Sequence, residues 1–224
     1  MFQNNDTIDT NLNCYEKLKR DIIDGVYAPC EKLSMSKLTQ ALKVGQSPIR
    51  EALSRLLAKG LVEMEENKGF RVPCISENDL YDLCRTIAQI ENVAIRQSLQ
   101  LGDDKWEINF VAACHRLSLN ENKKEPNYNY WVQCTQDFHK ALIMGCKSPT
   151  LINIHEHLFL KLERYIRLAF KFDLGLVDFC YQRKKLILEA VLKRDADETC
   201  RLYIYNLMGT KDEILNSLRN KKLL

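Results

Sequence analysis

Beyond residue 76, apolar residues recur every three or four positions, which is the spacing that places them on one face of an α-helix. Short polar breaks that contain glycine, proline or charged residues interrupt this pattern. The breaks separate helices predicted at 77–101, 105–120, 128–147, 149–172, 178–193 and 196–217. Because only helical periodicity is found there, we expect an all-α bundle of six or seven helices.

The first 60 residues show the same helical spacing in three shorter stretches. Tyr15, Leu18 and Ile22 predict a helix that ends at Gly25, and Ser34 can cap a second helix over 35–44. The third stretch, SPIREALSRLLAKG, has a proline in its first turn and a glycine at its end, as helices prefer. Its predicted buried stripe consists of Ile49, Ala52, Leu53, Leu56 and Leu57.

The pattern changes after the third helix. LVEME and FRV, at 61–65 and 70–72, are strand-like runs, and NKG between them has the composition of a hairpin turn. Three helices followed by a hairpin form the layout of a winged helix-turn-helix. We therefore expect a mostly α protein with a flexible tail at 1–11, a winged helix-turn-helix domain at 12–75 and an all-helical domain at 77–224.

Positive charge is local in this chain. The formal net charge is only +3, yet five basic residues stand against one acid between Lys37 and Gly60. This segment can be an ordinary solvated helix face, or it can bind an anion such as DNA. The helix-turn-helix context favours DNA, with the first turn of the third helix in the major groove and the hairpin tip at the backbone. The residues expected to contact DNA are Ser36, Lys37, Gln46, Ser47, Arg50, Lys68 and Gly69.

The nine cysteines include no CxxC pair, so the sequence favours reduced thiols over a zinc ribbon or a disulfide framework. The polar N-terminus has no signal peptide, and no apolar run approaches the ~18 residues that indicate a membrane span. We therefore expect a cytoplasmic protein without a membrane partner.

Several motifs resemble a known family. SPIREALSRLLAKGLVEMEENKGFRV, at 47–72, resembles the DNA-binding domain of GntR family transcription regulators. WVQCTQDFHKALIMGC and LFLKLERYIRLAF resemble segments of the FCD effector domain of the FadR-type subfamily, near the carbon-starvation-induced regulators. The resemblance implies a homodimer that binds a pseudo-palindromic double-stranded operator and represses transcription, with a small metabolite in the helical domain modulating DNA binding. It does not imply an enzyme.

Two departures concern DNA recognition. The family often has an arginine immediately before the recognition helix, and the matching residue here is Gln46. The second helix of FadR carries another arginine, and the matching residue here is Ser36. Because glutamine pairs well with adenine, we expect Gln46 to shift the preferred base.

The resemblance also implies a metal site, but the ligands do not match. Of four expected ligand positions only His139 keeps a metal-binding side chain, since the others match Thr135, Arg183 and Asn206. We therefore expect no metal or other cofactor. A guanidinium can bind a carboxylate directly, so we expect Arg183 to line an effector pocket with Thr135, His139 and Asn206. Alternatively, Arg183 pairs with a neighbouring acid or lies at the surface.

Other interpretations remain open. The family's arginine four residues before Glu91 is replaced by Ile87, which is consistent with a degenerate pocket and a ligand-independent regulator. His155 and His157 lie two positions apart, so on a helix they diverge and cannot grip one ion. An enzyme or a small-molecule carrier is a further alternative, but Asp137 and His139 diverge in the same way and offer no catalytic pair.

Overall fold

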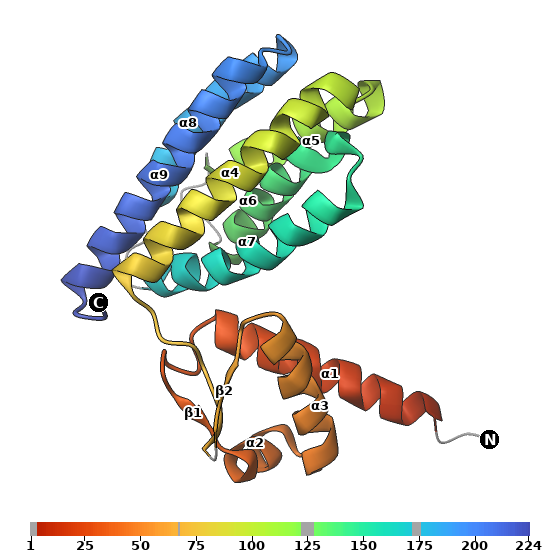
Figure 1. The fold of residues 1–224 in the computed structure, drawn as a ribbon, viewed down its shortest axis with the longest axis vertical. Helices are drawn as coiled ribbons and strands as arrows, with labels where there is room; N and C mark the ends of the chain where they lie inside the picture. The colour runs from red at the N-terminus through yellow and green to blue at the C-terminus, as the bar shows by residue number, and fades with distance from the viewer. Residues whose placement is uncertain (1–3, 67, 122–127, 172–175) are drawn as a thin grey trace. The chain divides into compact units, whose positions relative to one another are not determined.

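The computed structural model describes residues 4–66, 68–121, 128–171 and 176–224, and Figure 1 shows its fold. The described residues form nine α-helices, one short 3-10 helix and three short strands. One compact unit runs to Ser76 and takes in Leu160–Leu168, and the other comprises Glu77–Phe159 and Ala169–Leu224. The predicted fold class, mostly helical with a small N-terminal sheet, is confirmed.

Three helices make the framework of the first unit: α1 (Asn4–Ile23), α2 (Met35–Leu42) and α3 (Gln46–Ala58). Helix α1 packs along α3, and Leu18 and Ile22 are buried in the same core as the stripe of α3. The predicted stripe is buried except for Leu57, which is 37% exposed because it lies at the edge of that stripe. Burial of this face fixes α3 and leaves its opposite face in solvent.

Helix α1 is longer than the apolar pattern predicts. It begins at Asn4, so residues 4–11, which were expected to form a tail, are helical. This segment is rich in Asn, Asp and Thr, which are weak helix formers and carry no apolar stripe. Extending a helix that already exists costs far less than starting one, which explains how weak formers continue α1.

The wing is an antiparallel sheet. Strands β2 (Glu63–Glu65) and β3 (Gly69–Arg71) form the predicted hairpin, with Met64 opposite Phe70. Gly69 has φ +88°, a conformation that suits glycine because it has no side chain. A third strand, β1 (Lys32–Leu33), pairs with β3 and gives the order β1-β3-β2. The apolar pattern predicts a loop at β1, because two residues are too short to show a period.

A disulfide joins Cys30 and Cys74, whose Cα atoms lie 4.5 Å apart. The amide of Cys30 donates to the carbonyl of Val72 at 3.1 Å, so the pairing beside β3 brings together cysteines 44 residues apart. The expectation of reduced thiols is therefore wrong for this pair. The remaining described cysteines are free and buried: Cys14, Cys84, Cys114, Cys134, Cys146 and Cys200. Burial raises the pKa of Cys84 and Cys114 to about 12, which keeps these thiols protonated.

The second unit is all-helical, and most of its helix ends fall within three residues of the predicted ones. Its helices are α4 (Glu77–Leu101), α5 (Asp104–Glu121), α6 (Tyr128–Ile143), α7 (Pro149–Phe170), α8 (Leu176–Leu192) and α9 (Ala196–Asn220), with the 3-10 helix η1 (Met144–Cys146) after α6. Helix α9 packs against both α4 and α8, and α5 contacts both α6 and α8.

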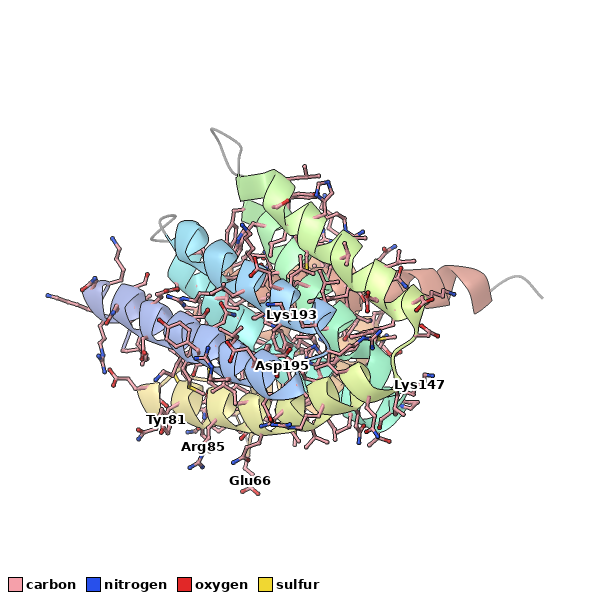
Figure 2. The ribbon with its side chains drawn as sticks, turned by 90° about the horizontal axis from the view of Figure 1, so that it is seen from above. Glu66, Tyr81, Arg85, Lys147, Lys193 and Asp195 are labelled. Atoms are coloured by element: carbon pink, nitrogen blue, oxygen red, sulfur yellow. A yellow bond between two sulfur atoms is a disulfide. The ribbon has the colours of Figure 1, made fainter. Side chains whose placement is uncertain are left out.

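Polar residues mark the outer face and the turns of this bundle. Tyr81 and Arg85 point outward from α4, and Lys193 and Asp195 mark the turn between α8 and α9 (Figure 2). Asp195 caps α9, because its Oδ1 accepts a hydrogen bond from the amide of Glu198 at 3.0 Å. Within the described ranges, no helix has the length and apolar character needed to cross a membrane.

Candidate nucleic-acid interface and effector pocket

A tight turn positions the start of α3. Helix α2 ends at Leu42, its C-cap Lys43 adopts a left-handed conformation with φ 55°, and Gly45 is the N-cap of α3. Gly45 has no side chain that can cap the helix, so the first N–H groups of α3 have no side-chain acceptor there. Gln46 and Ser47 are exposed in this first turn. Free N–H groups and the helix dipole together make such an N-terminus attractive to phosphate.

All seven residues predicted to contact DNA are exposed, but their basic groups differ in availability. Arg50 and Lys37 make no ion pair within the described residues, so their charges face solvent. On the wing, Lys68 donates to Glu65 at 2.7 Å, and this bond lowers the pKa of the Glu65 carboxyl. Arg55 stacks on the Tyr15 ring, 4.0 Å from its centroid, which directs it towards α1. The strongest cationic positions are therefore at the start of α3 and on α2.

The helical unit buries a group of polar side chains, referred to below as the polar cluster. Its members come from five helices, so that no short stretch of sequence contains them. They are Glu91 of α4, Thr135 and His139 of α6, His155 of α7, Lys184 of α8, and Tyr203 and Asn206 of α9.

Thr135, His139 and Asn206 lie in the polar cluster, whereas Arg183 does not. Arg183 donates to Glu213 at 2.8 Å and lies beside Gly209 on α9, and its Nη1 is buried without a hydrogen-bond partner among the described residues. The next residue, Lys184, is only 3% exposed, and its Nζ donates to Thr135 Oγ1 at 3.2 Å. Successive residues of a helix point about 100° apart, so a one-residue difference decides which cation enters the bundle.

His139 occupies the middle of the cluster. Its ring packs against Phe159 and Tyr203, with centroids 4.6 Å and 5.5 Å away. Burial, reinforced by the charges of Lys184 and His155, holds the pKa of His139 well below its usual value, so the imidazole is neutral near pH 7. Within the described structure, the His139 Nδ1, the Tyr203 hydroxyl and the Asn206 Oδ1 are buried without a hydrogen-bond partner. Such atoms are costly unless a ligand or water satisfies them.

Glu91 and His155 form a second buried pair that local sequence patterns do not predict. His155 Nδ1 contacts Glu91 Oε1 directly, and the His155 ring stacks on Phe159 at 4.5 Å. Burial raises the pKa of Glu91, and the neighbouring His155 opposes this rise. His157 is half-buried rather than enclosed, as expected for residues that diverge on a helix. Glu91 lies four positions after Ile87 and four before Ile95, both of which are buried. This spacing, which puts Glu91 on the buried face of α4, is the one sequence signal for its burial.

The polar cluster does not fit the metal that the FCD resemblance implies. Its central part offers an imidazole, an amide, a hydroxyl and an ammonium, and an ammonium nearby disfavours a cation. Glu91 and His155 are engaged with each other. Among the described residues, no group of three or more His, Cys, Asp or Glu side chains is arranged to hold an ion.

Comparison with known proteins identifies the family. Residues 10–72 match the model described as bacterial regulatory proteins, gntR family, and residues 82–205 match the FCD domain. The HTH-type transcriptional repressor GlaR of Escherichia coli (strain K12) is 34% identical over 204 residues, covering 89% of this chain and 93% of GlaR. The HTH-type transcriptional regulator BphR of Paraburkholderia xenovorans is 37% identical over 159 residues, covering 69% of this chain and 65% of BphR.

Solved structures agree at the level of the fold. The E. coli protein McbR/YncC matches with a TM-score of 0.76 at 16% identity, covering 92% of this chain and 97% of that one. A GntR regulator from Rhodococcus sp. RHA1 matches with a TM-score of 0.71 at 19% identity, covering 92% of this chain and 97% of that one. The chain therefore belongs to the GntR family of DNA-binding transcription regulators, not to a family of enzymes, and it carries a GntR winged helix followed by an FCD domain.

Proposed function

We propose that this protein is a cytoplasmic repressor that binds a pseudo-palindromic operator as a homodimer. A small organic acid in the helical domain modulates this binding. Relatives named as repressors, GlaR and RspR of E. coli, support the sign of regulation. A dimer suits a helix-turn-helix protein that recognises a short DNA sequence, because the two copies contact two half-sites one helical turn of DNA apart.

The observation that carries DNA recognition is the exposed, uncapped start of α3. In the proposed complex, Gln46 and Arg50 contact base edges in the major groove, where both side chains can make paired hydrogen bonds. Phosphate contacts position the domain without reading sequence. The residues assigned to them are Ser36, Lys37 and Ser47, together with Lys68 and the backbone of Gly69 on the wing.

The observation that supports a ligand is the polar cluster. The His139 Nδ1 on α6 and the Tyr203 hydroxyl and Asn206 Oδ1 on α9 are buried without hydrogen-bond partners among the described residues. Lys184 of α8 is buried and donates to Thr135, one helical turn before His139 on α6. A small acid that satisfies these groups stabilises one arrangement of the helices and thereby shifts operator affinity. Thr135, His139 and Asn206 remain in the proposed pocket, and Arg183 is assigned to its outer side.

Selection from randomised double-stranded DNA tests the operator. The full chain should enrich an inverted repeat, and binding to the enriched site should weaken steeply as salt rises, because phosphate contacts release counterions. A scrambled site of the same composition is the control. Enrichment of no sequence, or equal affinity for the scrambled site, would contradict sequence-specific DNA binding.

A further inference from the structure

We infer that Cys30 and Cys74 form a reversible thiol–disulfide modification site, and that closing the disulfide strengthens operator binding. Hydroperoxides are the class of oxidant that closes the site, and a dithiol is the class of reductant that opens it. The inference goes beyond the proposed function, because this input reaches the winged helix without passing through the effector pocket.

The disulfide lies at the surface of the winged-helix unit. Cys30 and Cys74 are both exposed, whereas the other described cysteines are buried. Oxidants and reductants in solution therefore reach this pair before the other described thiols, since thiol oxidation follows exposure. In the cytoplasm, where we propose that this protein acts, disulfides that form are usually transient and redox-sensing. Exposed disulfides are also the ones that dissolved thiols open most readily.

The turn that carries Cys30 favours a different residue. Residues 28–31 form a β-turn, closed by a hydrogen bond from the Glu31 amide to the Ala28 carbonyl at 3.1 Å. Pro29 at the second position and a φ of 65° for Cys30 at the third are features of a type II turn, whose third position favours glycine. A side chain at this φ is unfavourable, so the turn does not account for the cysteine. The bridge to the linker does.

Cys74 belongs to the linker at 73–76, which leads from the wing to α4. The disulfide fastens this linker to the turn before β1. Arg164 of α7 holds the same linker through its guanidinium, which donates to the carbonyls of Pro73 at 2.7 Å and Cys74 at 3.3 Å. Residues 160–168 of α7 lie in the same compact unit as the linker. Opening the disulfide therefore releases one of two attachments of the linker within this unit.

Backbone hydrogen bonds hold the same two segments without using the sulfur atoms. The Cys30 amide donates to the Val72 carbonyl at 3.1 Å, and the Val72 amide donates to the Glu31 carbonyl at 2.9 Å. These bonds keep the two thiols near each other after reduction, which favours closure of the bridge again. The bridge removes motion of the wing and linker that DNA binding would otherwise have to remove, so the bridged form is the tighter-binding one.

Closing the site is a two-electron oxidation. One thiolate attacks the O–O bond of a hydroperoxide, so that an S–O bond forms, the O–O bond breaks and an alcohol or water leaves. The second thiolate attacks the sulfur of the resulting sulfenic acid, so that the S–S bond forms, the S–O bond breaks and water leaves. Two thiols lose two electrons and two protons, which the peroxide takes up. A dithiol reverses the change by two thiol–disulfide exchanges and is itself oxidised to a disulfide.

Oxidation and reduction of the full chain test the inference. Hydrogen peroxide should close the pair and dithiothreitol should open it, as measured by alkylation of free thiols and peptide mass spectrometry. The bridged form should bind the selected operator about threefold to tenfold more tightly than the reduced form, measured by fluorescence anisotropy. A pair that responds to neither reagent, or a bridged form that binds equally or more weakly, would overturn the inference. A pair that responds in a protein without operator binding would contradict the proposed function instead.

Two cysteine variants separate the bridge from other thiols. Cys30→Gly removes the bridge and places glycine at a φ of 65°, which suits it, so the turn is retained. This variant should bind operator as the reduced protein does, and neither reagent should change its affinity. Cys14→Ala removes a buried thiol of the same unit and should respond as the unmodified chain does. A redox response that persists in Cys30→Gly would assign the effect to other thiols and overturn the inference.

Discussion

Lys184 Nζ lies 3.2 Å from Thr135 Oγ1, so α8 and α6 meet inside the bundle through an ammonium and a hydroxyl. The resemblance to FCD domains places metal-ligand positions at Thr135 and Arg183, not at Lys184. The adjacent Arg183 donates instead to Glu213 on α9. The two neighbouring cations of α8 therefore have different partners, a threonine of α6 for Lys184 and a glutamate of α9 for Arg183.

The Arg183–Glu213 pair is expected to be structural. Both side chains are about one-fifth exposed, at 20% and 19%, so their ion pair is partly screened by water. Arg183→Met should lower the free energy of unfolding by about 1 kcal/mol, with a similar loss in Glu213→Gln and a smaller added loss in the double variant. Urea unfolding of all four proteins measures this coupling. Strict additivity of the two losses would contradict the pair.

Neutral His139 predicts a pH dependence of stability. A histidine whose folded pKa lies below its unfolded value of ~6.5 gains its proton only on unfolding, so stability is present above that value and is lost as pH falls below it. The slope attributable to this residue approaches about 1.4 kcal/mol per pH unit. His139→Gln should remove that part of the slope. Urea unfolding between pH 7.5 and 5 compares the variant with the unmodified chain, and identical slopes would contradict a buried neutral His139.

The Cys30–Cys74 disulfide predicts a redox dependence of the winged helix. It closes a loop across a sequence separation of 44 residues. Chain-entropy estimates for such a loop give about 4 kcal/mol of stabilisation, which reduction should remove. Thermal unfolding with and without dithiothreitol measures this effect. The Cys30→Ser/Cys74→Ser variant should unfold as the reduced protein does and should not respond to reductant; an equal response of both proteins would contradict the assignment.

Gln46 predicts an altered base preference. Glutamine can make a paired contact with adenine, whereas arginine prefers guanine, and each such contact discriminates by about 1–3 kcal/mol. Gln46→Arg should move one position of the selected half-site from adenine to guanine, and Gln46→Ala should relax that position. Parallel DNA selections with the three proteins check this. The same half-site from all three would show that Gln46 does not read a base.

The sequence predicts most of the architecture because the helices are amphipathic and end at glycine, proline or charged residues. Helix α4 starts at Glu77 and ends at Leu101 as its apolar period predicts. The wing is also predicted, since Asn-Lys-Gly at 67–69 separates two strand-like runs. Strand β1 and the first turns of α1 are not predicted by the sequence, because neither shows a periodic pattern of apolar residues.

The interior of the helical domain is harder to predict. Arg183 and Lys184 are both cations, and only the rotation of α8 determines which one points inward. Glu91 and His155 are 64 positions apart on different helices, so no local pattern relates them. The disulfide likewise cannot be predicted from local sequence, since Cys30 and Cys74 meet only through backbone pairing beside β3. Long-range packing, rather than local spacing, assembles each of these contacts.

The most direct test of the account measures operator affinity by fluorescence anisotropy for the unmodified chain, Arg50→Ala and Lys59→Ala. Both variants lose one exposed charge of the α3 region, but Lys59 lies nine residues further along, about 14 Å from Arg50 along the helix axis. Arg50→Ala should lose about 1–3 kcal/mol of binding and specificity at one base, while Lys59→Ala should change little. Equal affinities for Arg50→Ala and Lys59→Ala would contradict recognition through the first turns of α3.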